Sequence, residues 1–106
     1  MNEANKLIEQ LENLNTQIAI IESQAQKLEL ENIQIDSALA ELEKTEGKVF
    51  KAVGPVLVET DAKKMIEELS EKRKDNDKKI EMIKKQAEKL KAKREEVQKQ
   101  LKEKVG

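Results

Sequence analysis

Apolar residues recur along both halves of the chain at alternating steps of four and three, which is the spacing of a coiled-coil heptad. In the first half only one member of this series is polar, and in the second half the series has more polar members but keeps the same rhythm. The pattern predicts two long helices, each with one apolar face. The core positions are Leu7, Leu11, Leu14, Ile18, Ile21, Ala25, Leu28, Asn32, Ile35, Leu39 and Leu42 in the first helix, and Ala62, Ile66, Leu69, Arg73, Asn76, Ile80, Ile83, Ala87, Leu90, Arg94, Val97, Leu101 and Lys104 in the second.

The two series also fit each other. If the chain folds back on itself, an antiparallel pairing of residues whose numbers sum to 108 aligns the layers from Leu7–Leu101 to Leu42–Ile66, and Asn32 then faces Asn76. A shift of register would strand both buried amides, at a cost of about 1–3 kcal/mol each. We therefore predict that Asn32 and Asn76 fix the register. The alternative is that both are chance polar interruptions of the core.

Between the helices lies a segment of different character, GKVFKAVGPVLVETD at residues 47–61. Two β-favouring runs flank Gly54-Pro55, where Gly permits unusual φ values and Pro cannot continue a strand, so we expect a β-hairpin. Gly47 is placed to end the first helix, and Thr60 or Asp61 to cap the second. The predicted fold is mainly α, a single domain over residues 1–106: a long antiparallel two-helix coiled coil with helices at 1–46 and 61–106 and a hairpin at 47–60.

An isolated two-stranded hairpin is unstable in water, and this one has apolar side chains on both faces. We expect it to pair with strands of other chains in an oligomeric β-barrel. An ordinary apolar turn over the end of the coiled coil would explain the Val and Leu content, but not the use of about ten residues where a few connect two helices. The predicted assembly residues are Val49, Phe50, Val53, Val56, Leu57 and Val58.

Composition excludes several classes of function. Of the 106 residues, 41% are charged, only Phe50 is aromatic, and there is no Cys or His. Carboxylates lie beside Lys at helix-surface spacing and no Gly-rich phosphate loop is present, so we expect neither an enzyme nor a cofactor. Residues 1–60 hold 5 Lys and Arg against 11 Asp and Glu, and residues 61–106 hold 16 against 11. The halves should attract each other, and without aromatic stacking groups we expect no nucleic-acid partner.

No apolar run is long enough to cross a bilayer, and the first residues, MNEANKLIEQ, lack the order of a secretory signal. We therefore expect no membrane partner and a cytoplasmic location.

The segment GKVFKAVGPVLVETDAKKMIEEL closely resembles the central segment of archaeal-type prefoldin β subunits, where the hairpin motif V-[YF]-K-x-V-G-x-[LV]-L-V-x-x-[DT] leads directly into the second helix. The resemblance covers the whole chain in architecture and about twenty residues in motif. It implies a heterohexamer of two α-type and four β-type chains, with hairpins closing into β-barrels and coiled coils projecting from them. It further implies an ATP-independent chaperone subunit that captures non-native client proteins and delivers them to a group II chaperonin.

Capture of non-native chains requires accessible apolar side chains, and folding back brings both termini to one end. Four of the candidates there are also core positions, whereas Ile8 and Val105 lie outside the core series. The rival interpretations are a structural coiled-coil tether and a helical-arm RNA-binding module, which use the same antiparallel helices. The predicted client-binding residues are Leu7, Ile8, Leu11, Val97, Leu101 and Val105.

Overall fold

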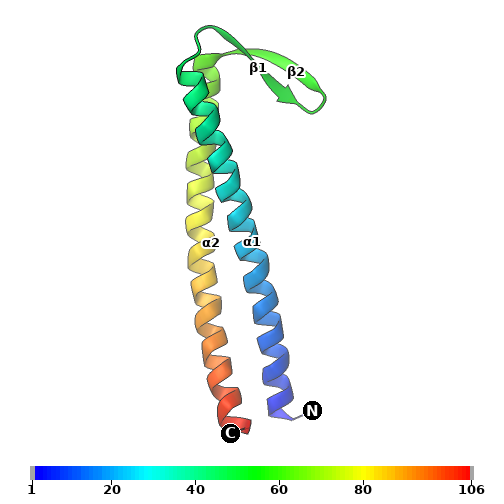
Figure 1. Ribbon diagram of the computed structural model, residues 1–106. Helices are drawn as coiled ribbons and strands as arrows, with labels where there is room; N and C mark the ends of the chain where they lie inside the picture. The colour runs from blue at the N-terminus through cyan, green and yellow to red at the C-terminus, as the bar shows by residue number, and fades with distance from the viewer. Residues whose placement is uncertain (1, 106) are drawn as a thin grey trace. The chain divides into compact units, whose positions relative to one another are not determined.

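Two long helices joined by a β-hairpin make up the protein (Figure 1). The computed structural model describes residues 2–105. Its elements, in chain order, are α1 (Glu3–Glu43), β1 (Lys48–Val53), β2 (Val56–Asp61) and α2 (Ala62–Val105). The predicted class, mainly α with a central antiparallel two-stranded hairpin, is confirmed.

The chain forms two compact units, and the first consists of Met1–Lys27 with Lys79–Gly106. In its described part the beginning of α1 packs against the end of α2, and the two segments run in opposite directions (Figure 1). Leu7, Leu14 and Val97 are buried at the centre of this unit, because their heptad positions face the other helix. Leu11, Leu90 and Leu101 are partly buried and pack against that cluster.

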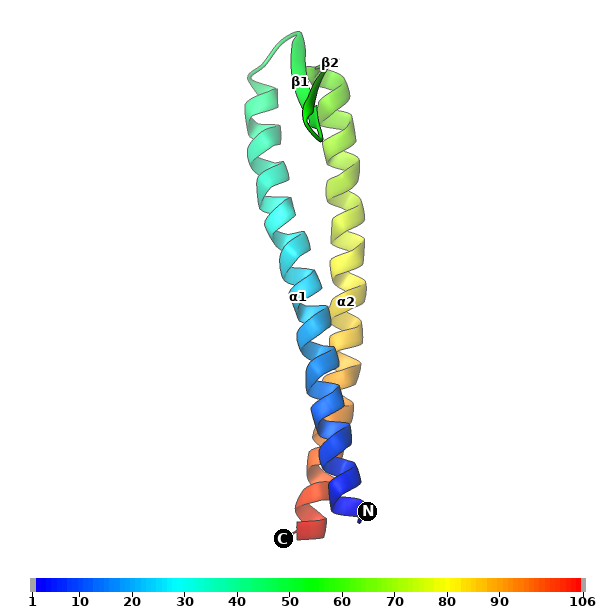
Figure 2. The same ribbon diagram turned by 90° about the vertical axis from the view of Figure 1, so that its right-hand side faces the viewer.

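The second unit, Leu28–Lys78, contains the end of α1, the hairpin and the beginning of α2. The hairpin projects to one side from the start of α2 (Figure 1) and points toward the viewer in Figure 2. An ion pair of 3.0 Å joins Lys51 of β1 to Glu68 of α2. Taking both units together, every predicted core position is buried or half-buried except Lys104, which is exposed. That prediction was wrong because Lys104 lies in the last turn of α2, where its ammonium group extends to Glu3.

The helix ends have local explanations. At the start of α1 the Asn2 side chain accepts a hydrogen bond of 2.8 Å from the Asn5 amide, as an N-cap residue does. α1 ends at Glu43, three residues before the predicted end at 46. The Lys44 and Thr45 amides donate to the carbonyl groups three residues earlier, which tightens and ends the last turn. Gly47, expected to end the helix directly, instead leads into β1 with a φ of 89°.

The hairpin is a regular antiparallel pair closed by a two-residue turn. Its register pairs Val53 with Val56 next to the turn and Lys48 with Asp61 at the open end. Gly54 has a φ of 58°, and no other residue of the turn has a positive φ. A positive φ at the first central residue followed by Pro indicates a type II′ turn, which matches the twist of paired strands. The two residues of the predicted turn are therefore confirmed.

The hairpin ends where α2 begins, and Asp61 serves both elements. It is the last residue of β2, and its carboxylate accepts a hydrogen bond of 2.8 Å from the Lys64 amide, three residues into α2. Of the two predicted cap residues, Thr60 and Asp61, the structure uses Asp61. The carboxylate also lies near the positive end of the helix dipole.

We predict that Asp61→Ala lowers the free energy of unfolding by about 1 kcal/mol, because one amide of the first turn of α2 loses its acceptor. Thermal unfolding followed by circular dichroism should show a midpoint about 5 °C lower. Asp61→Asn is the matched control, since Asn caps as well as Asp and should change the midpoint by much less. Equal midpoints for all three proteins would contradict the capping role.

Candidate functional site

The hairpin presents two different faces. Directly paired residues of an antiparallel ladder lie on the same face, so the register of the hairpin sorts its side chains into two sets. One face has Val49, Lys51, Val53, Val56, Val58 and Thr60. The other has Lys48, Phe50, Ala52, Leu57, Glu59 and Asp61, with an ion pair of 3.6 Å between Lys48 and Glu59.

The first of these faces is directed towards the protein's own helix near the open end of the hairpin, while Val53, Val56 and Val58 nearer the turn are 44–57% exposed. The Lys51 side chain reaches Glu68 of α2, and Val49, Lys51 and Thr60 are half-buried. On the second face Phe50 and Leu57 are 66% and 68% exposed. The Phe50 face therefore points away from α2 and is uncovered in the single chain.

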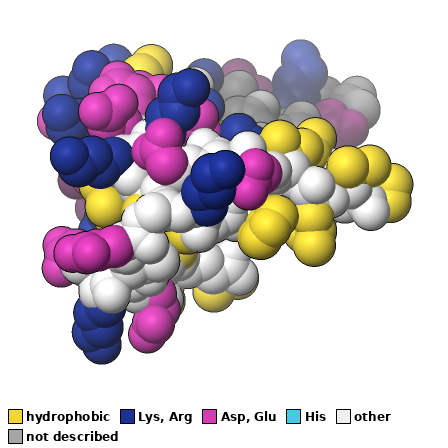
Figure 3. Space-filling model, turned by 90° about the horizontal axis from the view of Figure 1, so that it is seen from above, with side chains coloured by type: hydrophobic (Ala, Val, Ile, Leu, Met, Phe, Trp, Pro, Cys, Tyr) yellow, Lys and Arg dark blue, Asp and Glu magenta, His cyan; other side chains and the backbone are white. Residues whose placement is uncertain are grey.

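Apolar side chains gather on the hairpin (Figure 3). Among the predicted assembly residues, Val49 is half-buried, while the others are between 44% and 68% exposed. An apolar cluster of this kind on a small protein marks an interaction surface. The exposed members are Phe50, Val53, Val56, Leu57 and Val58.

The backbone of the hairpin also has groups available for pairing. The Ala62 amide donates a bond of 2.9 Å to the Gly47 carbonyl, which identifies this position as a hydrogen-bonded pair of the ladder. Hydrogen-bonded and non-hydrogen-bonded pairs alternate along antiparallel strands. The amide and carbonyl groups of every second residue therefore point outward from the two edges. They belong to Lys48, Phe50 and Ala52 on β1 and to Leu57 and Glu59 on β2.

The second candidate surface lies near the two termini. Leu7 and Val97 are buried, and Leu11 and Leu101 are half-buried, so these four predicted client-binding residues form part of the core. Ile8 is 42% exposed and Val105 is 70% exposed. The structure thus separates the predicted set into four core residues and two that solvent reaches. Their role in client binding stays a prediction.

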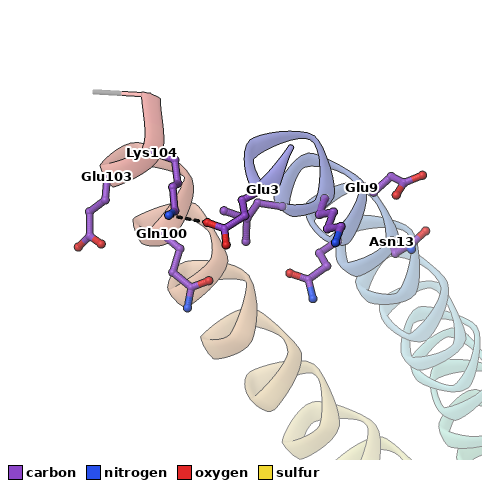
Figure 4. Close-up of a pocket in the computed structure, with 9 residues that line it drawn as sticks. Glu3, Glu9, Asn13, Gln100, Glu103 and Lys104 are labelled. Carbon is purple, nitrogen blue, oxygen red and sulfur yellow. Dashed lines mark ion pairs between the residues drawn. The ribbon is translucent and has the colours of Figure 1, made fainter. Parts of the chain in front are cut away.

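A groove of about 520 Å³ opens at the same end of the helix pair, lined by Leu7 and by polar and charged side chains of both helices (Figure 4). Glu3 and Lys104 form an ion pair there. The hydrogen bond from the Lys104 ammonium group, together with its charge, holds the pKa of the Glu3 carboxyl below its usual value, and Glu3 in turn raises the pKa of Lys104. Because the pKa of Glu3 is lowered, its carboxyl stays ionised at a lower pH than an unpaired Glu, and the pair is lost as the pH falls through that pKa.

The predicted contact between Asn32 and Asn76 is present in the second unit. Asn76 Nδ2 donates to Asn32 Oδ1 at 3.0 Å, and the residues are 2% and 5% exposed, respectively. Asn32 Nδ2 donates to Asp77 at 3.0 Å, and Asn76 Nδ2 also donates to Glu31 at 2.8 Å. Among the described residues no buried side-chain nitrogen or oxygen atom lacks a partner. Three hydrogen bonds thus hold the two amides in this layer, which favours its predicted role in fixing the register.

Sequence reasoning missed the charged residues around this layer. Arg73 donates to both carboxylate oxygens of Asp36, at 2.9 and 3.1 Å, and to Asp77 at 2.7 Å. Lys72 lies 3.7 Å from Glu31. The heptad pattern placed Arg73 in the core series. A guanidinium group at a core position needs carboxylates beside it, and this requirement was the signal in the sequence. The polar layer thus extends to both sides of the helix pair.

Further apolar side chains lie on the outer surfaces of the helices. Leu30 and Ile33 are 57% and 63% exposed, and Ile20 and Met82 are 53% and 70% exposed. Their positions outside the heptad core series were the signal for all four. Single apolar residues on a surface are common, and we assign these no role.

Among residues 2–105 we found no cluster of side chains suited to hold a metal ion. No helix in this range is long and apolar enough to cross a membrane.

Comparison with known proteins agrees with this architecture. A family model described as Prefoldin subunit matches residues 5–106. Prefoldin subunit beta of Thermococcus onnurineus (strain NA1) is 34% identical over 93 residues, which cover 86% of this chain and 80% of that protein. Prefoldin subunit beta of Archaeoglobus fulgidus is 33% identical over 97 residues, which cover 90% of this chain and 84% of that protein. The crystal structure of the prefoldin beta subunit from Thermococcus strain KS-1 superimposes with a TM-score of 0.86 at 28% identity, covering 99% of this chain and 94% of that one.

Proposed function

This chain belongs to the prefoldin family of chaperone subunits, and from that membership we propose that it is a β-type subunit that holds non-native proteins without ATP. Membership in this family implies assembly into a prefoldin complex with other subunits. The proposal adds the composition of that complex, two α-type and four β-type chains, a cytoplasmic location, and delivery of clients to a group II chaperonin. It also holds that the chain has no enzymatic activity.

One observation carries the proposal: the hairpin has an uncovered apolar face and two unpaired backbone edges in the single chain. Phe50 and Leu57 are 66% and 68% exposed on that face. A monomer gains nothing from such a surface, whereas strands from neighbouring subunits would cover both the side chains and the edges. Closure into a barrel removes exposed strand edges altogether. This favours an assembly built on the hairpins.

The helices suit the second part of the proposal. α1 has 41 residues, which at 1.5 Å per residue gives a length of about 60 Å. Helices of this length would give each subunit two long arms, with Ile8 near the free end of α1 and Val105 at that of α2. Several such ends can hold one client at once, so weak apolar contacts combine into useful affinity.

The rival functions use the same helices but predict other behaviour. A structural tether or a helical-arm RNA-binding module needs no partner for its hairpin, and an RNA complex would weaken steeply with salt. The exposed apolar hairpin favours the chaperone subunit over both.

Sizing the chain alone and with an archaeal prefoldin α subunit separates these functions. We expect a single complex larger than either component, formed at both low and high salt because its interface is apolar. This complex should suppress the aggregation of a denatured test protein without nucleotide. Two components that elute separately, or a complex that leaves aggregation unchanged, would contradict the proposal.

A further inference from the structure

The two sides of the helix pair near the termini differ in character. The ion pair of 2.8 Å between Glu22 and Lys91 marks one side of the first unit. Ile8 lies two heptads before Glu22, and Val105 lies two heptads after Lys91. Since the coiled-coil pattern repeats every heptad, Ile8 and Val105 lie on this same side, one on each helix. We call this side, defined by Ile8, Leu101 and Val105, the apolar flank.

The apolar flank contains a groove of about 530 Å³. Leu101 is half-buried in it, and Val105, 70% exposed, stands at its end. Both side chains offer apolar surface to a ligand at little cost to the core. The groove is lined by Glu95, Gln98, Lys99, Leu101, Lys102 and Val105.

The groove on the other side is of similar size, but all of its lining side chains except Leu7 are polar or charged. Gln10, Asn13 and Gln100 line it, and the ion pair between Glu3 and Lys104 lies within it (Figure 4). An apolar ligand entering there would have to displace water from amides and charges that it cannot hydrogen-bond. The two grooves therefore do not offer equivalent sites for an apolar segment.

The charges around the apolar flank indicate which apolar segments fit it best. Lys99 and Lys102 line the groove, and neither forms an ion pair within residues 2–105, whereas Glu95 is the only carboxylate in the lining. The lining of this groove, with two Lys and one Glu, therefore has a net positive charge. A segment with carboxylates next to its apolar residues would meet this charge, and a segment with Lys or Arg there would be repelled.

We propose that the apolar flank is the client-binding surface of this subunit, and that it selects apolar segments of non-native proteins that carry acidic side chains beside them. This inference rests on the proposed function and adds to it a side of the helix pair and a preference among clients. The bound client segment is an extended or helical peptide. Ile8, Leu101 and Val105 hold it, and Lys99 and Lys102 orient it.

The test uses the chain in its complex with an α-type prefoldin subunit and three fluorescent peptides. The peptides share one Leu- and Phe-rich centre and differ only in flanking Glu, Lys or Ser residues, and binding is followed by anisotropy at low salt. We expect the Glu-flanked peptide to bind about fivefold more tightly than the Lys-flanked one, as two partly exposed charge pairs allow. The double variant Lys99→Glu/Lys102→Glu should invert this order.

The location of the client-binding surface is tested with a pair of matched variants. Ile8→Ser/Val105→Ser should weaken binding of all three peptides by about tenfold or more, because two apolar contacts are lost. Gln10→Ser/Gln100→Ser alters the opposite groove to a similar extent and should leave binding unchanged. All four side chains are exposed, so neither variant disturbs the helix core.

Two outcomes would overturn the inference while leaving the proposed function intact. Equal losses in the two Ser variants would show that clients do not distinguish the two sides. An unchanged order of peptides after charge reversal would show that Lys99 and Lys102 do not select them. Failure of the unsubstituted complex to bind any peptide or any denatured protein would instead contradict the proposed function itself.

Discussion

Leu57→Asp should abolish assembly with other prefoldin subunits while the helices stay folded. Leu57 is 68% exposed in the single chain, so the substitution costs the isolated chain little. In an assembled barrel the same position would be covered, and an unpaired carboxylate there would cost several kcal/mol. A penalty of about 4 kcal/mol raises the dissociation constant about a thousandfold. Size-exclusion chromatography with light scattering should therefore show separate components at micromolar concentration.

Ile33→Asp is the control for this variant. Ile33 is 63% exposed, close to Leu57, but lies on α1 and not on the hairpin. The Ile33→Asp variant should therefore assemble normally. Circular dichroism should give the same helical content for both variants. A Leu57→Asp protein that forms a complex of normal size would remove the hairpin face from the interface, and loss of assembly in both variants would point to a nonspecific effect of the added charge.

Replacing the buried asparagines should have an effect that depends on whether one or both are changed. Asn76→Leu alone leaves the Asn32 carbonyl oxygen buried without its 3.0 Å donor, which costs about 1–3 kcal/mol. This cost offsets most of the gain from burying a leucine, which is about 1.5–3 kcal/mol. The double variant Asn32→Leu/Asn76→Leu leaves no buried amide. The carboxylate partners Asp77 and Glu31 are accessible to water and tolerate the loss.

We therefore expect the double variant to melt at a higher temperature than the original protein, and its gain to exceed the sum of the two single gains. It should also populate other registers or oligomers, because the polar layer no longer disfavours them. Thermal unfolding of the four proteins of this cycle gives the first result, and native mass spectrometry gives the second. Additive changes with a single unchanged oligomeric state would contradict the role of Asn32 and Asn76 in fixing the register.

How much of this structure the sequence could predict depends on the range of the forces involved. The heptad series placed Asn32 opposite Asn76 because layer pairing follows from periodicity alone. It did not place Arg73 between Asp36 and Asp77, since long side chains beside the core choose among several rotamers and partners. Periodicity also failed at Lys104, where the core ends and an exposed ion pair with Glu3 is available.

The hairpin, too, was predictable from the sequence only in part. Gly54-Pro55 was sufficient to predict the turn, because a backbone with positive φ favours Gly and the strand direction reverses within two residues. Which face of the hairpin is directed to the protein's own helix was not predictable, since it depends on the contact between Lys51 and Glu68, seventeen residues apart. Near the two termini, the heptad pattern placed Ile8 and Val105 outside the core series, and both are exposed. The difference between the two grooves there needed the positions of the side chains.

The central claim, that this chain captures non-native proteins at the ends of its helices once its hairpins have assembled, is tested most directly by shortening those ends. The measurement is the aggregation of a denatured test protein, without nucleotide, in the presence of the complex containing either the full chain or a chain lacking residues 1–8 and 99–106. The deletion removes Ile8, Leu101 and Val105 but leaves the hairpin and the Asn32–Asn76 layer intact. We predict a complex with its full complement of subunits that no longer suppresses aggregation. Undiminished protection by the shortened complex would contradict the claim.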